Sequence, residues 1–247
     1  MPLRNRVALI TGGTRGIGRG IALRLARQGA RIAIGYRSNK TAAQSALHAL
    51  QASGADCVAI ESDITNAARA EQLVKTVTDR FGRLDILINN VGDFRWGGLA
   101  DGSLEDWQNI FNSNLMSVVY VSRAALPHMR KGRWGRIVNL GAVGAERAFG
   151  QAKISAYAAA KAAVVALSRS LALEEAKNGI TVNVVNPSSI DEKALSLEEA
   201  RKLRDARFPI GRPPTVEDVA AAVAFFASDE AEYITGQIVN VSGGWML

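Results

Sequence analysis

Tyr157 and Lys161 are the two residues of this chain whose types and spacing point most directly to catalysis. They stand four residues apart in the segment AYAAAK, so they share one face of a helix. A phenol can give a proton to a carbonyl oxygen, but its ordinary pKa of about 10 is high for chemistry at neutral pH. A neighbouring ammonium group favours the phenolate, so we expect Lys161 to lower the pKa of Tyr157. The Tyr-x-x-x-Lys pattern alone also occurs by chance.

A glycine-rich segment follows the first short apolar run and precedes a helical pattern. It reads TGGTRGIG over residues 11–18. Glycine at 12, 16 and 18 lets the backbone turn sharply and approach a pyrophosphate group. The free N–H groups and the dipole of the following helix favour phosphate at the same place. We therefore expect a dinucleotide-binding loop here, rather than a tight turn without a ligand.

The end of the second predicted strand indicates which dinucleotide is bound. NAD enzymes of this architecture usually carry an acidic residue there for the ribose 2′-hydroxyl. This chain has Arg37 and Ser38 instead, with Arg15 in the glycine-rich loop. Arginine can bind a 2′-phosphate that a carboxylate would repel, so NADP(H) is favoured. The alternative is that Arg37 is simply exposed and that both cofactors are accepted.

Further candidates follow the later strands. Asp63 either accepts a hydrogen bond from the adenine amino group, caps the next helix, or does both. Asp93 either enters the pocket as an extra carboxylate or, as we favour, is a loop residue. The complete set expected to contact the cofactor is Gly12, Thr14, Arg15, Gly16, Ile17, Gly18, Arg37, Ser38, Asp63, Ile64, Asn90, Gly92, Tyr157, Lys161, Pro187 and Ser188. No metal site is expected.

Short β-rich apolar runs alternate with longer helical patterns along the whole chain. The runs lie at 7–11, 31–36, 56–60, 85–89, 136–140, 181–186 and 237–241, and the helical stretches near 17–28, 40–53, 66–81, 104–130, 152–177 and 215–228. Continuous apolar runs are typical of strands that are covered on both faces. The alternation predicts an α/β fold with one doubly wound, Rossmann-like parallel sheet of about seven strands and helices on both faces. In such a sheet, ligands bind beyond the carboxyl ends of the strands.

Composition limits the other possibilities. The 247 residues are 48% hydrophobic and contain no linker-like segment, which predicts a single domain over 1–247. No apolar run approaches the roughly 18 residues that span a bilayer, so no membrane association is expected. Cys57 is the single cysteine, so no internal disulfide can form, and a reducing cytoplasm is the expected location.

The net charge of +7 is concentrated near the N-terminus. Residues 1–55 hold nine Lys and Arg and no acidic residue, whereas the remainder holds 21 basic and 23 acidic residues. Such a field attracts a polyanionic cofactor. A solvated basic face is the simpler interpretation for any single arginine. No nucleic-acid partner is expected, because no basic run is interleaved with aromatic residues.

Taken in order, these motifs resemble the short-chain dehydrogenase/reductase family, in its classical type. The resemblance runs over almost the whole chain and rests on TGGTRGIG, NNVG, GRIVNL, YAAAK and GITVNVVNP. The tail, PIGRPPTVEDVAAAVAFFASDEAEYITGQIVNVSGG, resembles the C-terminal region of bacterial 3-oxoacyl-(acyl carrier protein) reductases. The family resemblance implies hydride transfer between NADP(H) and a carbonyl or alcohol substrate, which an acyl carrier protein could carry.

The resemblance also assigns roles to individual residues. Tyr157 would be the general acid, and Lys161 would in addition hold the nicotinamide ribose. Asn114 would kink its helix and hold a water that links Lys161 to solvent. A short substrate lid would lie near 188–208, with one helix over 197–206. A homotetramer would form through the two long helices near 104–130 and 152–177 and through the C-terminal segment.

The chain departs from the family pattern at the substrate end. The serine that normally follows the fifth strand is replaced by Ala142, and no serine lies between Ser122 and Ser155. The segment that leads to Tyr157 is about two residues longer than usual. Ser188 and Ser189 follow Pro187 where the family normally has glycine. We hypothesise that Ser188 partly replaces the missing serine.

Three functions remain open on this basis. The first is an NADPH-dependent reductase of a ketone or a 3-oxoacyl thioester. The second is a dehydrogenase of a small or cyclic alcohol. The third is an NADP-binding protein that has lost catalysis. Ala142 favours the third function, but the retention of Tyr157, Lys161 and Asn114 argues against it, since a decayed site has no reason to keep all three.

Overall fold

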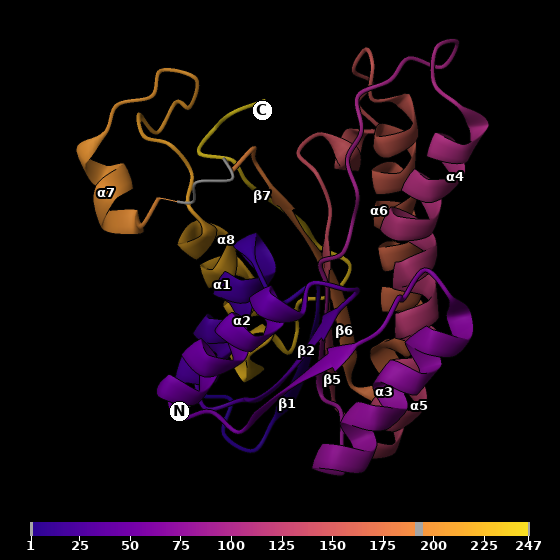
Figure 1. Ribbon diagram of the computed structural model, residues 1–247, viewed down its shortest axis with the longest axis vertical. Helices are drawn as coiled ribbons and strands as arrows, with labels where there is room; N and C mark the ends of the chain where they lie inside the picture. Colours follow the sequence, from indigo (N-terminus) through magenta and orange to yellow (C-terminus); the bar gives the residue numbers. More distant parts are fainter. Residues whose placement is uncertain (1, 191–194, 247) are drawn as a thin grey trace.

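The computed structural model describes residues 2–190 and 195–246 (Figure 1). Its strands are β1 (Val7–Thr11), β2 (Arg31–Tyr36), β3 (Cys57–Glu61), β4 (Ile86–Asn89), β5 (Gly135–Leu140), β6 (Ile180–Pro187) and β7 (Ile238–Val241). They form one parallel sheet in the order β3-β2-β1-β4-β5-β6-β7. The doubly wound fold is therefore confirmed, and each predicted strand differs from the observed one by at most one residue at each end. The strand order changes direction between β1 and β4, where such sheets bind ligands.

Helices cover both faces of the sheet (Figure 1). The helices are α1 (Gly16–Arg27), α2 (Lys40–Ala52), α3 (Ala67–Phe81), α4 (Leu104–Phe111), α5 (Ser117–Gly132), α6 (Ser155–Glu175), α7 (Leu197–Lys202) and α8 (Val216–Phe226). Short 3₁₀ turns follow at Ala145–Arg147, Ala176–Asn178 and Asp229–Ala231. Helices α1, α2 and α8 pack on one face, and α3, α5 and α6 pack on the other.

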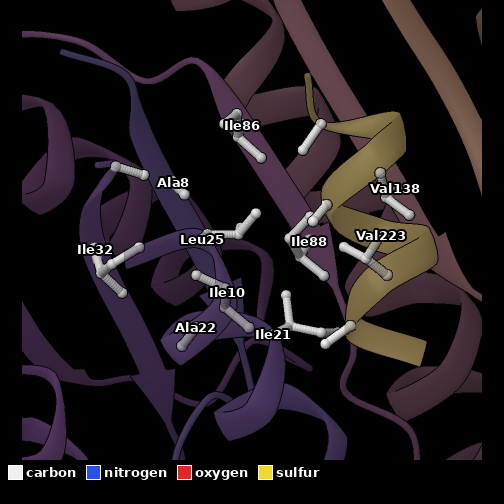
Figure 2. Close-up of a cluster of buried hydrophobic side chains, with 14 of the residues drawn as sticks. Ala8, Ile10, Ile21, Ala22, Leu25, Ile32, Ile86, Ile88, Val138 and Val223 are labelled. Atoms are coloured by element: carbon white, nitrogen blue, oxygen red, sulfur yellow. The ribbon is translucent and has the colours of Figure 1, made fainter. Parts of the chain in front are cut away.

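Strands β1 to β6 contribute side chains to both of the hydrophobic layers that cover the sheet. Figure 2 shows Ile10 and Ile88 of the sheet beside Ile21 of α1 and Val223 of α8, all fully buried. Residues of the opposite parity, such as Leu9, belong to the layer under α3 and α5. Because both faces are covered, the strands are mostly apolar on both sides, which is why their sequences show no alternation. The polar exceptions, such as Arg136, Asn139 and Asn183, are themselves buried.

Two helix predictions need correction. The helix expected over 104–130 is divided into α4, a π-helical turn at Asn112–Met116 and α5. In the turn the Asn114 amide donates to the carbonyl of Ile110, and the hydroxyl of Ser117, the first residue of α5, donates to the carbonyl of Ser113. The helix expected over 197–206 begins with a capping box at Ser196 but ends at Lys202. Leu203 is extended, and the backbone N–H of Asp205 donates to the carbonyl of Gly211 instead of continuing the helix.

Helix α6 with the turn after it (Ser155–Asn178) is long and apolar enough to cross a bilayer by length and composition, with a mean hydropathy of 1.3. The expectation that no stretch reaches this length is wrong by this measure. However, α6 packs on β6, and Leu171 and Ala172 belong to the buried layer of the sheet. The core helix of a globular protein passes the same test, and packing on the sheet accounts for the part of α6 that is buried, which is 39% of its apolar window.

Candidate active site

A cleft of about 800 Å³ opens at the carboxyl ends of β1 to β4. It is lined by most of the residues predicted to contact a cofactor: Gly12, Thr14, Arg15, Gly16, Ile17, Arg37, Ser38, Asp63, Ile64, Asn90 and Gly92. The cleft also takes in Asn39, Ser113, Ile190 and Val216, which the sequence did not single out. Gly18, Tyr157, Lys161, Pro187 and Ser188 do not line it. Its volume lies in the range of about 300–1,000 Å³ that is usual for small-molecule sites.

The glycine-rich loop owes its shape to glycines and to Asn90. Gly12 and Gly16 have φ angles of 65° and 49°, a region in which other residues are strained. The Asn90 side-chain amide donates to the carbonyls of Thr11 and Gly12, at 3.0 and 3.2 Å. Gly18 lies directly beneath, and a Cβ there would collide with the carbonyl oxygen of Gly12 and approach the Asn90 amide. Gly18 therefore does not face the cleft, and its lack of a side chain leaves room for the carbonyl of Gly12 and the amide of Asn90.

Residues at the ends of β2 and β3 define the far end of the cleft. Arg37 is exposed, and its Nη1 lies 3.9 Å from Oδ2 of Asp93. The Asp63 carboxylate accepts hydrogen bonds from the backbone and the hydroxyl of Thr65, at 3.1 and 2.7 Å. The alternative expectation that Asp63 caps α3 is wrong. Asn66 caps α3, because a turn at residues 63–66 delays the start of the helix.

Tyr157 and Lys161 occupy the first two turns of α6, beside the end of β5. The Nζ of Lys161 lies 5.6 Å from the centre of the Tyr157 ring and donates a 2.8 Å hydrogen bond to the carbonyl of Leu140. The ring of Phe94 contacts the Tyr157 ring edge to face, with 5.0 Å between centroids. The spacing of four residues thus places the phenol and the ammonium group together, as the sequence predicts.

Asn114 lies in the π-helical turn and faces the same region. Its amide nitrogen donates to the carbonyls of Ile110 and Asp93, at 3.0 and 2.8 Å. Its Oδ1 is buried and has no hydrogen-bond partner among the residues that the structure describes. A Cβ on Gly92 would collide with this oxygen and would lie 3.3 Å from Nζ of Lys161. Asn114 and Lys161 therefore border one small space that only glycine at 92 leaves open.

Burial controls the ionisation of both α6 residues. It raises the pKa of Tyr157 to about 12, because the phenolate would lose its hydration. It lowers the pKa of Lys161 to about 8, because the ammonium group suffers the same loss. The expectation that Lys161 lowers the pKa of Tyr157 is therefore not met. The reason is that desolvation opposes charge on both groups.

The position of the missing serine lies where β5 and β6 end side by side. Leu140 pairs with Val185, and the N–H of Gly141 donates to the Val185 carbonyl, so Ala142 and Ser188 lie on adjoining strand ends. Ala142 is half-buried. The Ser188 hydroxyl is buried and has no hydrogen-bond partner within residues 2–190 and 195–246. An enclosed hydroxyl without a partner is unusual and calls for an explanation.

Glu146, which the sequence did not single out, bonds the segment between β5 and α6 to the sheet. Its carboxylate accepts hydrogen bonds from the side-chain amides of Asn186 and Asn240, both at 3.0 Å. These amides belong to β6 and β7, so one carboxylate joins the segment after β5 to the ends of two strands. The hydrogen bond from Asn240 and the nearby Arg147 keep the pKa of Glu146 below its usual value, although burial opposes them most strongly. No local sequence signal marks this contact.

Comparison with known proteins agrees with this geometry. The family described as enoyl-(acyl carrier protein) reductase matches residues 12–246. The 3-oxoacyl-(acyl carrier protein) reductase FabG of Vibrio cholerae is 41% identical over 99% of this chain and 98% of its own. The hydroxynaphthalene reductase arp2 of Aspergillus fumigatus is 36% identical over 97% of this chain and 92% of its own. A short-chain dehydrogenase/reductase from Serratia marcescens superposes with a TM-score of 0.90 at 34% identity, covering both chains completely.

The chain belongs to the short-chain dehydrogenase/reductase family, as its motifs predict. It is an oxidoreductase of that family, similar over nearly its whole length to reductases of 3-oxoacyl groups.

Proposed function

We propose that this chain is an NADPH-dependent reductase that transfers a hydride to the carbonyl of a 3-oxoacyl thioester or a related ketone. The observation that carries the proposal is the placement of Tyr157 beside Lys161, with Lys161 held by the carbonyl of Leu140 at the end of β5. The similarity to FabG of Vibrio cholerae supports the choice of substrate. Attachment of the substrate to an acyl carrier protein is part of the same proposal.

The residues of the cleft fit a dinucleotide. Gly12 and Gly16 have left-handed backbones, and the cleft volume of about 800 Å³ is suitable for a cofactor. In this proposal Arg37 and Arg15 bind the 2′-phosphate, and Asp63 binds the adenine. The remaining expected cofactor contacts of the loop and the strand ends are Thr14, Ile17, Gly18, Ser38, Ile64, Asn90, Gly92, Pro187 and Ser188. NADPH supplies the hydride when it is bound.

Tyr157 donates the proton to the carbonyl oxygen in this mechanism. With the pKa of Tyr157 near 12 and that of Lys161 near 8, the phenol keeps its proton at neutral pH and the ammonium group keeps its charge. That combination suits proton donation by the phenol, which is the role that the reduction of a carbonyl requires. Lys161 also holds the nicotinamide ribose hydroxyls. The Oδ1 of Asn114, which has no partner among the described residues, would accept a hydrogen bond from a water, and that water would replace the proton that Lys161 gives up when the Tyr157 phenolate is reprotonated.

A ring ketone is the second candidate substrate. Phe94 contacts both the Tyr157 ring and the Trp96 ring edge to face, with centroid distances of 5.0 and 5.2 Å. Phe94 and Trp96 are 50% and 62% exposed, so they present aromatic surface next to the proposed proton donor. Aromatic surfaces bind planar rings well. The similarity to a hydroxynaphthalene reductase favours the same candidate.

The proposed protein is a cytoplasmic homotetramer with a substrate lid near 188–208. Leu104 of α4 and Leu173 of α6 are 80% and 83% exposed, which supports contacts between copies through these helices. The lid contains α7, and residues 191–194 of it lie outside the described residues. The competing function is that of an NADP-binding protein that has lost catalysis.

The test is the Tyr157→Phe variant with Tyr233→Phe as its control, since Tyr233 is fully exposed. NADPH consumption is measured with a 3-oxoacyl thioester, an open-chain ketone and a ring ketone. Tyr157→Phe should lose about 10²–10⁴-fold in turnover and keep its affinity for NADPH. Full activity of this variant would refute the mechanism. NADPH binding without turnover of any substrate by the wild-type protein would favour the non-catalytic function.

A further inference from the structure

Asp93 joins the π-helical turn to the arginine at the far end of the cleft. Its backbone N–H donates to Oγ of Ser113 at 3.2 Å, and its carbonyl accepts from the Asn114 amide at 2.8 Å. Its carboxylate lies 3.9 Å from the Arg37 guanidinium. Both Asp93 and Arg37 line the cleft, and their side chains are 56% and 62% exposed. The backbone of Asp93 is thus held in place while its charge faces Arg37.

We propose that Asp93 is a cofactor-specificity residue that limits the preference for NADPH over NADH. The proposal rests on the proposed function, in which Arg37 binds the 2′-phosphate. A 2′-phosphate that reaches Arg37 must displace the Asp93 carboxylate or come close to it. If the phosphate displaces the carboxylate, the ion pair between Asp93 and Arg37 is lost. If both stay near Arg37, the phosphate and the carboxylate repel each other. NADH has a hydroxyl group at this position and leaves the ion pair intact, so the penalty falls on NADPH alone.

The other charges around the cleft single out Asp93 for this role. Among the described residues that line the cleft, the acidic ones are Asp63 and Asp93 and the basic ones are Arg15 and Arg37. The Asp63 carboxylate is engaged by Thr65. Asp93 is therefore the carboxylate that competes for Arg37. An exposed ion pair is weak, so the effect corresponds to a severalfold change in affinity rather than a complete switch.

The experiment compares the dissociation constants of NADPH and NADH for the wild-type chain and for Asp93→Asn. Asparagine keeps the size of the side chain and leaves both backbone hydrogen bonds in place. The Kd of NADPH should fall about two- to fivefold, while that of NADH should stay within about twofold. The gain should shrink at high salt, because the charges are exposed. The Asp93→Ala variant should likewise bind NADPH more tightly than the wild-type chain does.

Glu61→Gln is the matched control. Glu61 is an exposed carboxylate at the end of β3 that pairs with Lys40 at 3.5 Å and does not line the cleft. If Glu61→Gln raised the NADPH preference as much as Asp93→Asn, net charge rather than the Arg37 contact would be responsible. The gain should also fall by half or more in an Arg37→Ala background. A full gain in that background, or a change in the NADPH-to-NADH ratio of less than about twofold in the wild-type background, would overturn the proposal.

The outcomes separate this proposal from the function on which it rests. A wild-type chain that binds NADPH and reduces ketones, with an unchanged ratio in Asp93→Asn, contradicts the role of Asp93 alone. A wild-type chain that binds neither nucleotide contradicts the proposed function as well.

Discussion

The ammonium nitrogen of Lys161 donates a 2.8 Å hydrogen bond to the backbone carbonyl of Leu140, the last residue of β5. This bond attaches the second turn of α6 to the sheet edge at which ligands bind. Lys161 is only 5% exposed, so its charge is stabilised by this carbonyl rather than by water. The pKa of Lys161 falls to about 8 as a result of burial, within the range in which enzymes are assayed.

The pH dependence of the reaction should follow Lys161. Because its pKa is lowered to about 8, Lys161 loses its charge as the pH rises through that value. Tyr157, with its pKa raised to about 12, keeps its proton over the same range. The kcat/KM for reduction should therefore be level near neutral pH and fall above about pH 8. A kcat/KM profile that stays level to about pH 10 would contradict this role. The Lys161→Ala variant should lose most of the activity, and its remaining activity should not fall near pH 8.

Arg37→Ala should weaken the binding of NADPH and leave NADH nearly unchanged. A charge-assisted contact to phosphate is worth about 1.5–3 kcal/mol, or roughly 10- to 150-fold in Kd. The comparison variant is Arg24→Ala, which removes an exposed arginine of α1 that does not line the cleft. Equal affinities of the wild-type chain for NADPH and NADH would remove the basis of the NADPH assignment.

Ala142→Ser should raise kcat on a reactive ketone, since a preorganised donor at the developing oxyanion contributes roughly 10²–10³-fold. Ser188→Gly should lower kcat without changing the affinity for NADPH, if the buried hydroxyl of Ser188 turns to the substrate when ligands bind. Ser189→Gly controls for the added backbone freedom, because Ser189 is the exposed neighbour.

An unchanged kcat in Ser188→Gly would end the idea that Ser188 replaces the missing serine. If Ala142→Ser also has no effect, either the substrate is of another class or the chain is an NADP-binding protein without catalysis.

Gly18→Ala should damage the cofactor loop. The added methyl group collides with the carbonyl of Gly12 and crowds the Asn90 amide that holds the loop. Overpacking of this kind costs about 1–3 kcal/mol, or roughly 2–12 °C in Tm for a domain of this size. NADPH binding should weaken in parallel. Gly132→Ala, at the exposed end of α5 with open space for a Cβ, should leave both Tm and Kd unchanged, and equal losses in the two variants would argue against a specific role for Gly18.

The sequence alone was sufficient for the fold and for the family. Strand boundaries were predictable to within one residue because strands buried on both faces are mostly apolar over their whole length. The pairing of Tyr157 with Lys161 was predictable for an equally local reason, since four residues make about one helical turn. Features that depend on periodicity within one element can be recognised without knowledge of the neighbouring elements.

Contacts between distant parts of the chain required the tertiary structure. The ion pair of Arg37 with Asp93 joins the ends of β2 and β4, and no pattern in either segment signals the other. The helix expected over 104–130 looks continuous in the sequence, yet Asn114 lies in a π-helical turn and its side chain bonds to the loop after β4. From the sequence, Lys161 was expected to lower the pKa of Tyr157, whereas burial raises it. Burial also lowers the pKa of Lys161. The loss of hydration depends on what surrounds a group in space, and the spacing of residues along the chain does not report that.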